Sequence, residues 1–122
     1  DGTCVRDYIH VEDLADAHLA ALELTAASAP GHVALNLGTG AGFSNRQVIA
    51  AVEQVTGARV PHEMGPRRPG DPPVLVAAND EARRVLGWTP ARSTLDQMIG
   101  SAWRWRQAQR DGAAGAPDRA QG

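Results

Sequence analysis

The sequence predicts a small chain of the α/β class. Short segments rich in aliphatic and aromatic residues alternate with longer segments whose apolar residues recur at helical spacing. Glycine and proline stand between most of these segments. Hydrophobic residues make up 43% of the 122 residues, which is enough for a modest core.

The first predicted pair is a strand at 8–11 (YIHV) and a helix at 13–28, with Asp13 as its N-terminal cap. Apolar residues cover most of this helix, which indicates burial on more than one side. A chain of this length offers little to bury such a helix against. The chain also begins at Asp1 rather than at methionine. We therefore expect a packing partner outside the chain.

The second pair is a strand at 33–37 (VALNL) and a helix that opens at Ser44, separated by a loop at 38–42. Gln47 stands three residues after Ser44, the spacing of a capping box. Gly57 is expected to end this helix.

The next stretch is expected to contain a strand at 60–64, a proline-rich loop at 65–73 and an extended segment at 74–77. Asn79 is the predicted cap of a short helix that Gly87 ends.

Thr94 and Gln97 form a second predicted capping box, which opens the last helix. Trp103 and Trp105 lie on that helix among aliphatic residues, so we expect them to pack in a core. From 111 to 122 the sequence has no apolar periodicity, and we expect a disordered tail there.

Composition disfavours several classes of function. All 12 basic residues are arginine, so a lysine Schiff base or P-loop lysine is impossible within this chain. The net charge of −2 disfavours a nucleic-acid-binding role. The single cysteine, Cys4, rules out an internal disulfide. The four histidines lack metal-ligand spacing, and no apolar run suits a membrane helix. We expect no metal site, no membrane partner and a cytoplasmic location.

No catalytic residue is assigned. Tyr8 is the only tyrosine, and position 12 is Glu12, so the Y-x-x-x-K pair of many nicotinamide enzymes is absent from this chain. The glycine-rich segment 35–42 (LNLGTGAG) gives G-x-G, but Phe43 stands where a third glycine would complete a dinucleotide fingerprint. We interpret it as a tight turn, with an anion site at the following helix start as the alternative.

Residues 66–71 (PRRPGD) place two adjacent arginines between prolines. Guanidinium groups bind phosphate in a two-pronged manner, and the prolines limit the ordering cost on binding. Asp71 could accept hydrogen bonds from sugar hydroxyls, and Arg6 is a second candidate cation. From the residues alone, a surface loop with paired arginines and half of an anion site are equally favoured.

Several segments in order resemble the C-terminal third of the UDP-glucose 4-epimerase family, part of the extended short-chain dehydrogenase/reductase superfamily. The resemblance covers residues 1 to about 108. It implies a C-terminal UDP-sugar-binding region at 1–110, with the N-terminal Rossmann core outside the chain. The segments that carry it are DGTCVRDYIHVEDLADAHLAAL, LNLGTGAGFS, PRRPGD and ARRVLGW.

The resemblance implies an enzyme that interconverts UDP-glucose and UDP-galactose through an NAD-dependent 4-keto intermediate. This part would bind the UDP group and be inactive alone, because the catalytic Tyr-Lys pair and NAD site lie outside it. The complete parent would be a homodimer. One alternative is another NAD-dependent nucleotide-sugar epimerase, dehydratase or decarboxylase. An alternative of another class is a non-catalytic binding module that retains the fold.

The resemblance also assigns site residues by position. Arg6 and Arg68 match arginines that contact the diphosphate, and Asp71 matches the acid that binds the uridine ribose. Arg67 is expected to be a solvated neighbour. Tyr8 is implied to line the same pocket as Arg6, and Asn45 is implied as a contact on the uridine side.

Overall fold

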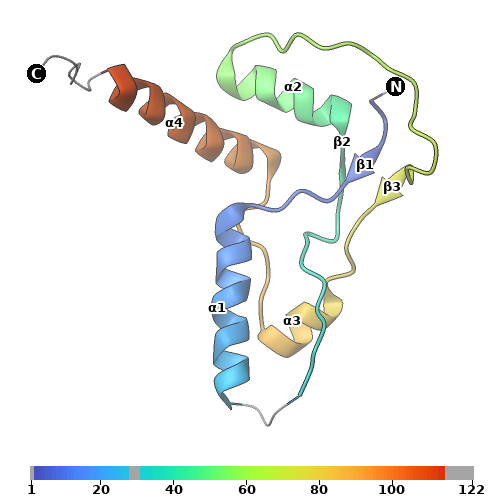
Figure 1. Ribbon diagram of the computed structural model, residues 1–122, viewed down its shortest axis with the longest axis vertical. Helices are drawn as coiled ribbons and strands as arrows, with labels where there is room; N and C mark the ends of the chain where they lie inside the picture. The colour runs from blue at the N-terminus through green and yellow to red at the C-terminus, as the bar shows by residue number, and fades with distance from the viewer. Residues whose placement is uncertain (1, 28–30, 115–122) are drawn as a thin grey trace, which may run out of the picture.

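The computed structural model describes residues 2–27 and 31–114, and within them one small sheet lies between two pairs of helices (Figure 1). Strand β1 (Val5–Arg6) is the centre of the sheet. It pairs antiparallel with β2 (Phe43–Ser44) and parallel with β3 (Val74–Leu75). Three distant parts of the chain therefore meet at two residues, Val5 and Arg6.

The helices pair at opposite ends of the molecule. Helix α2 (Asn45–Thr56) packs against α4 (Leu95–Ala114) on one side of the sheet. Helix α1 (Val11–Ala27) packs against α3 (Asp80–Leu86) on the other side, as Figure 1 shows. The mixed architecture confirms the predicted α/β class.

A small core joins α1, α3 and the segment that follows α3. Ala17 and Ala82 are fully buried, and their small side chains let the two helices approach closely. Trp88 is buried beside them, and its indole N–H donates to the Asp13 carbonyl at 2.8 Å. Partly buried hydrophobic residues complete the cluster: Ile9, Leu35, Leu37 and Leu86.

The predicted capping box of α2 is confirmed, and Thr94 caps α4 through its hydroxyl. Ser44 accepts from the Gln47 N–H, and the Gln47 side chain accepts from the Ser44 N–H, which completes the capping box of α2. Gly57 ends α2 with a left-handed φ of 69°. The Thr94 hydroxyl accepts from the Gln97 N–H at 3.3 Å at the start of α4.

Three predicted strands are wrong. Residues 8–10 are irregular and Val11 already begins α1, while 33–37 and 60–64 form no strand either. A strand needs a neighbour for its backbone groups, and the ladders of the described residues involve only β1, β2 and β3. The segment at 74–77 does pair, but only over Val74–Leu75.

The predicted cap of α1 is wrong, and that of α3 has the predicted position but not a capping side chain. The cap of α1 is His10, whose Nδ1 accepts from the Glu12 N–H at 3.0 Å. Asp13 lies inside the helix, with its side chain buried. Asn79 is the N-cap residue of α3, but its side chain makes no capping hydrogen bond, because its amide donates to the Gly38 carbonyl at 2.8 Å.

Several large apolar side chains remain exposed in this chain. Leu19 and Leu22 of α1 are 59% and 65% exposed, and Trp105 of α4 is 64% exposed. The prediction that Trp105 packs in a core is therefore wrong for this chain, whereas Trp103 is half-buried. Helix α4 continues to Ala114, four residues into the predicted tail, and the rest of that segment lies outside the described residues. No helix in the described part of the chain is long and apolar enough to cross a membrane.

Candidate functional site

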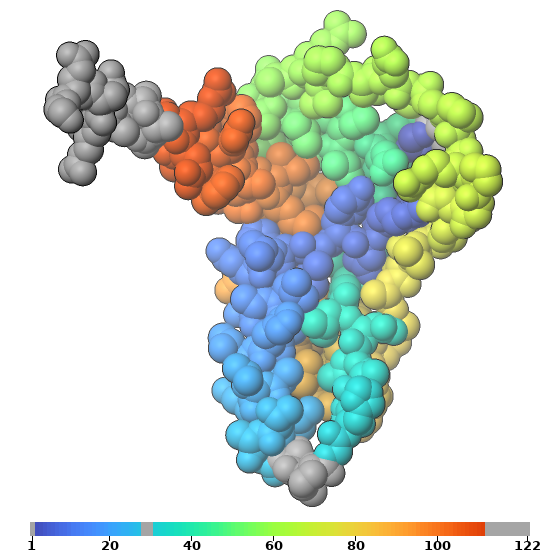
Figure 2. Space-filling model, in the orientation of Figure 1, coloured from blue at the N-terminus to red at the C-terminus, as the bar shows by residue number. Residues whose placement is uncertain are grey.

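A cavity of about 520 Å³ lies between the start of the chain, the first turn of α2 and the loop that leads to β3. Its volume is within the range of small-molecule sites. Figure 2 shows the yellow-green loop arching over the dark blue N-terminal segment, with a hollow beneath it. Four of the five predicted site residues line this cavity: Arg6, Asn45, Arg68 and Asp71.

Arg6 is held firmly at the wall of the cavity. Its Nη2 lies 2.6 Å from Asp71 Oδ1, and its Nη1 donates to the Pro72 carbonyl at 3.0 Å. A third hydrogen bond joins Nη1 to the Val5 carbonyl at 2.7 Å. These contacts fix the plane of the guanidinium before any ligand arrives, which lowers the ordering cost of binding an anion.

The PGD part of the loop forms a tight turn that carries a second arginine to the same carboxylate. The Asp71 N–H donates to the Arg68 carbonyl at 3.2 Å, and Gly70 has a φ of 79°. Pro69 and Gly70 occupy the central positions that a type II turn favours. Arg68 Nη2 lies 3.4 Å from Asp71 Oδ2, and its side chain is 83% exposed. Asp71 thus lies between two guanidinium groups, and the exposed one is free to turn toward a ligand.

Arg67 is exposed, as expected of a solvated neighbour, but it also has a defined contact. Its Nη2 donates to the Thr3 hydroxyl at 2.7 Å, and it also lines the cavity. This contact joins the arching loop to the start of the chain. Three arginines and two acidic residues, Glu63 and Asp71, line the cavity, so positive charge predominates.

Tyr8 reaches the site indirectly. Its hydroxyl donates to Asn45 Oδ1 at 3.4 Å, and Asn45 lines the cavity while Tyr8 does not. The first N–H groups of α2 are already used, because those of Asn45 and Arg46 donate to the Cys4 and Gly2 carbonyls. The side chains of the arginines, not the start of this helix, therefore supply the donors of the cavity.

The glycine-rich loop is a tight turn, as the sequence favoured. The N–H groups of Thr39 and Gly40 donate to the Asp7 carboxylate at 2.9 and 3.1 Å. Gly40 has a φ of 75°, which a residue with a side chain rarely adopts. The alternative, that this loop donates to an external anion, is disfavoured because an internal carboxylate occupies these donors.

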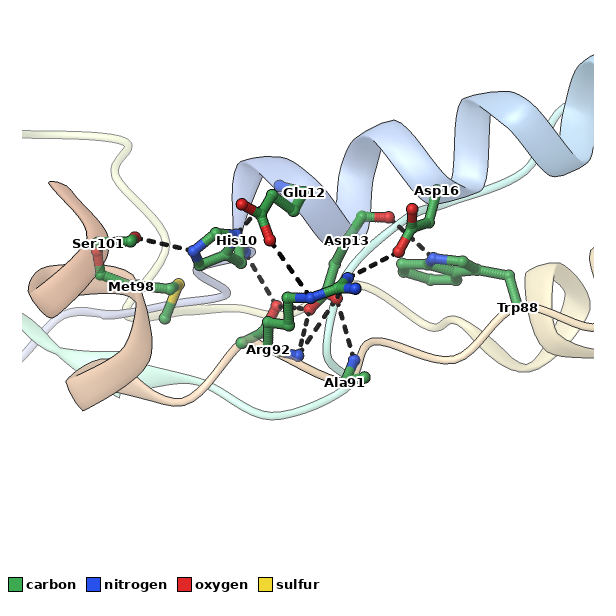
Figure 3. A network of polar contacts seen from close by, with 10 residues as sticks. His10, Glu12, Asp13, Asp16, Trp88, Ala91, Arg92, Met98 and Ser101 are labelled. Atoms are coloured by element: carbon green, nitrogen blue, oxygen red, sulfur yellow. Dashed lines mark hydrogen bonds and ion pairs between the residues drawn. The ribbon is translucent and has the colours of Figure 1, made fainter. Parts of the chain in front are cut away.

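A buried polar network outside the cavity ties α1 to α4 (Figure 3). Asp13 accepts from the Ser93 hydroxyl at 2.6 Å, and Ser93 accepts from the His10 N–H at 2.9 Å. His10 Nδ1 accepts a backbone N–H, so its hydrogen is on Nε2 and points to Ser101 Oγ, 2.8 Å away. The Met98 carbonyl accepts from the Ser101 hydroxyl at 2.9 Å. The network fixes the segment that connects β1 to α1.

Asp13 is the charged centre of this network. Burial raises its pKa, but hydrogen bonds from Ser93 and from the backbone of Arg92 and Ala91, with the Arg92 charge, outweigh burial and hold the pKa below 3.8. Sequence reasoning missed this role. The available signal was a carboxylate within a helix whose neighbouring positions are mostly apolar.

The described residues do not fit a resident cofactor. In the G-x-G segment at 38–40, the N–H groups of Thr39 and Gly40 donate to Asp7, and the third glycine position is Phe43. Across residues 2–27 and 31–114, no group of three or more His, Cys, Asp or Glu side chains is arranged to hold a metal ion. The cavity lined by Arg6, Arg67 and Arg68 does bring convergent charged groups to a place that a ligand can reach.

The fold and the cavity place the chain among α/β proteins with an arginine-lined site of nucleotide size. A family model described as the NAD dependent epimerase/dehydratase family matches residues 1–38. A UDP-glucose 4-epimerase of Azospirillum brasilense is 50% identical over 119 residues, which cover 96% of this chain and 34% of that protein.

Solved structures give the same result. UDP-glucose-4-epimerase from Stenotrophomonas maltophila, with bound NAD and formylated UDP-arabinopyranose, matches with a TM-score of 0.82 and 45% identity over 92% of this chain and 33% of that one. The Bifidobacterium longum enzyme in complex with NAD+ and UDP matches with a TM-score of 0.80 and 41% identity, over 92% of this chain and 32% of that one. The chain thus spans about a third of the length of its relatives. The resemblance to UDP-glucose 4-epimerases inferred from the sequence is confirmed.

Proposed function

We propose that this chain is the C-terminal, UDP-binding part of a UDP-glucose 4-epimerase. The observation that carries the proposal is the convergence of Arg6, Arg68 and Asp71 on one cavity, in a chain whose relatives are UDP-glucose 4-epimerases over nearly all of its length. The parent enzyme would interconvert UDP-glucose and UDP-galactose through a 4-keto sugar, with NAD as the resident oxidant.

In this proposal the arginines bind the diphosphate. Arg6 presents a guanidinium already oriented by Asp71 and Pro72, and Arg68 supplies an exposed one that closes on the other side. The excess of positive charge in the cavity supports an anionic ligand. A carboxylate has about four acceptor positions, so Asp71 retains room for a ribose hydroxyl beside its two arginines. Asn45, positioned by Tyr8, provides an amide on the uridine side.

We propose that the redox chemistry occurs outside these residues. The glycine-rich segment of the described residues lacks the dinucleotide fingerprint that would bind NAD. Tyr8 has no lysine partner, because the chain contains no lysine. The role of this part is then to bind and orient the nucleotide while residues elsewhere in the parent hold NAD and move the sugar proton. The 122-residue chain alone is accordingly expected to show no epimerase activity.

The parent is also proposed to act in the cytoplasm as a homodimer. This extension rests on the resemblance alone. Sedimentation of the complete protein at micromolar concentration tests it, since a monomer would contradict the dimer.

The experiment for the function supplies UDP-galactose to the complete protein and measures UDP-glucose. Production of UDP-glucose is expected, whereas a stable keto-sugar product would indicate a dehydratase instead. Arg68→Ala should weaken UDP-sugar binding by about 1.5–3 kcal/mol, the usual contribution of a hydrogen bond to a charged group, since this side chain is exposed. Arg83→Ala on exposed α3 is the matched control and should have no effect. Unchanged affinity in Arg68→Ala would remove that residue from the site.

A further inference from the structure

Asp7 follows Arg6 directly and joins three segments that surround the site. Its Oδ1 accepts from the Thr39 N–H at 2.9 Å and from the Thr39 hydroxyl at 2.6 Å. Its Oδ2 accepts from the Gly40 N–H at 3.1 Å and from the Ala77 N–H at 3.2 Å. One carboxylate thus connects β1 to the glycine-rich loop and to the end of the segment that continues β3.

The loop is built to fit this carboxylate closely. A Cβ atom at Gly38 would lie 2.5 Å from Asp7 Oδ2 and 2.6 Å from the Ala77 side chain. No side chain can occupy that space. The close approach therefore requires both the glycine and a carboxylate that takes up the backbone N–H groups.

Strand β1 ends at Arg6 and carries that arginine to the cavity. Asp7 follows directly, so the anchoring of its carboxylate restrains the backbone that holds Arg6. The ladder between β1 and β3 is only two residues long. The Asp7 N–H donates to the Leu75 carbonyl at 3.2 Å, just beyond that ladder. Because Asp71 lies shortly before β3, the alignment of β1 with β3 sets the distance from Arg6 to Asp71.

We propose that Asp7 is a positioning residue for the diphosphate contact of Arg6. The inference rests on the proposed function, and Asp7 itself touches no ligand. The guanidinium is oriented by its own contacts to Val5, Pro72 and Asp71, but the backbone that carries it is paired over only two residues in each ladder. The Asp7 carboxylate adds a restraint on that backbone. An asparagine would keep the shape but lose one acceptor oxygen, leaving some of these N–H donors unpaired.

The test measures UDP and uridine binding to the complete protein for wild type, Asp7→Asn, Arg6→Ala and the double variant. Asp7→Asn should weaken UDP binding about tenfold, equivalent to about 1.4 kcal/mol, and leave uridine binding unchanged. The double variant should bind UDP no more weakly than Arg6→Ala, because both changes act on one contact. Glu81→Gln, which alters an exposed ion pair on α3, is the matched control and should change neither affinity.

The outcomes are distinguishable. Wild type that fails to bind UDP would overturn the proposed function itself. If wild type binds UDP, two results would overturn the inference and leave only a structural role for Asp7. In the first, Asp7→Asn weakens UDP and uridine binding equally. In the second, the losses of UDP affinity from Asp7→Asn and Arg6→Ala add independently. If Asp7→Asn does not fold, Thr39→Val removes one hydrogen bond to the carboxylate. That variant should still weaken UDP selectively, and unchanged UDP affinity would overturn the inference.

Discussion

Arg6 and Asp71, 65 residues apart in the sequence, form an ion pair with 2.6 Å between Nη2 and Oδ1. The pair spans the cavity wall from β1 to the loop before β3. Asp71 also lies 3.4 Å from the exposed Arg68, so a single carboxylate orients Arg6 and lies beside the second candidate phosphate ligand. The cavity is thereby preorganised for an anion.

Asp71→Asn should separate the effect of Asp71 on UDP binding, through the orientation of Arg6, from its effect on the free energy of unfolding. The pair is partly exposed to solvent, so its loss should lower the free energy of unfolding by no more than about 1 kcal/mol. UDP affinity should fall more than that, because Arg6 loses the partner that orients it. Urea unfolding and UDP titration of the same variant measure the two quantities. Equal UDP affinity in wild type and variant would contradict the orienting role.

Asp13 should be far more important to stability than its neighbour on the same helix. Asp13→Ala leaves the part-buried N–H groups of Ala91 and Arg92 and the Ser93 hydroxyl without their acceptor and should cost about 3 kcal/mol. Asp16→Ala, which removes an exposed contact to Arg92, is the matched control and should cost less than about 1 kcal/mol. Urea denaturation of both variants makes the comparison, and similar losses would show that the network is not centred on Asp13.

The lowered pKa of Asp13 predicts an acid limb of the stability curve. A carboxyl with a folded pKa below its unfolded value binds protons more readily when unfolded, so it stabilises the fold above the unfolded pKa. This stability is lost as the pH falls from 3.8 through the folded pKa. Asp13→Asn should therefore show a weaker decline of the unfolding free energy over that range. If the unfolding free energy of Asp13→Asn declines as steeply with falling pH as that of wild type, the decline comes from other carboxyls.

The exposed apolar face of α1 predicts weak stability of the 122-residue chain alone. Leu19→Gln and Leu22→Gln should change the unfolding free energy by no more than about 0.5 kcal/mol, because both side chains are already exposed. Leu35→Gln, within the small core, should lower it by more than about 2 kcal/mol. Binding of an apolar dye to the isolated chain should fall in the first two variants. A sharp, high-temperature two-state melt of this chain would contradict the expectation.

The sequence predicted helices better than strands for a physical reason. Capping signals such as Ser44 with Gln47, and the terminal Gly57, act within a few residues, so they are readable locally. The segments at 8–11 and 33–37 have strand-like composition, but a strand also requires a partner. No local pattern reveals whether a partner is present.

Part of the candidate site could also be predicted from the sequence. Arg6, Arg68 and Asp71 were named from residue chemistry and resemblance, and the structure brings all of them to one cavity. Asp7 and Asp13 were missed, because the value of a carboxylate that binds backbone N–H groups depends on folding of the chain around it.

The central claim is tested most directly by calorimetric titration of UDP into the complete protein and its Arg6→Ala variant. Wild type should bind UDP, and Arg6→Ala should weaken binding by about 2–5 kcal/mol, or roughly 30-fold to 5,000-fold. Arg84→Ala, on exposed α3, serves as the charge-matched control. Equal UDP affinity in wild type and Arg6→Ala would contradict the assignment of this cavity to the diphosphate.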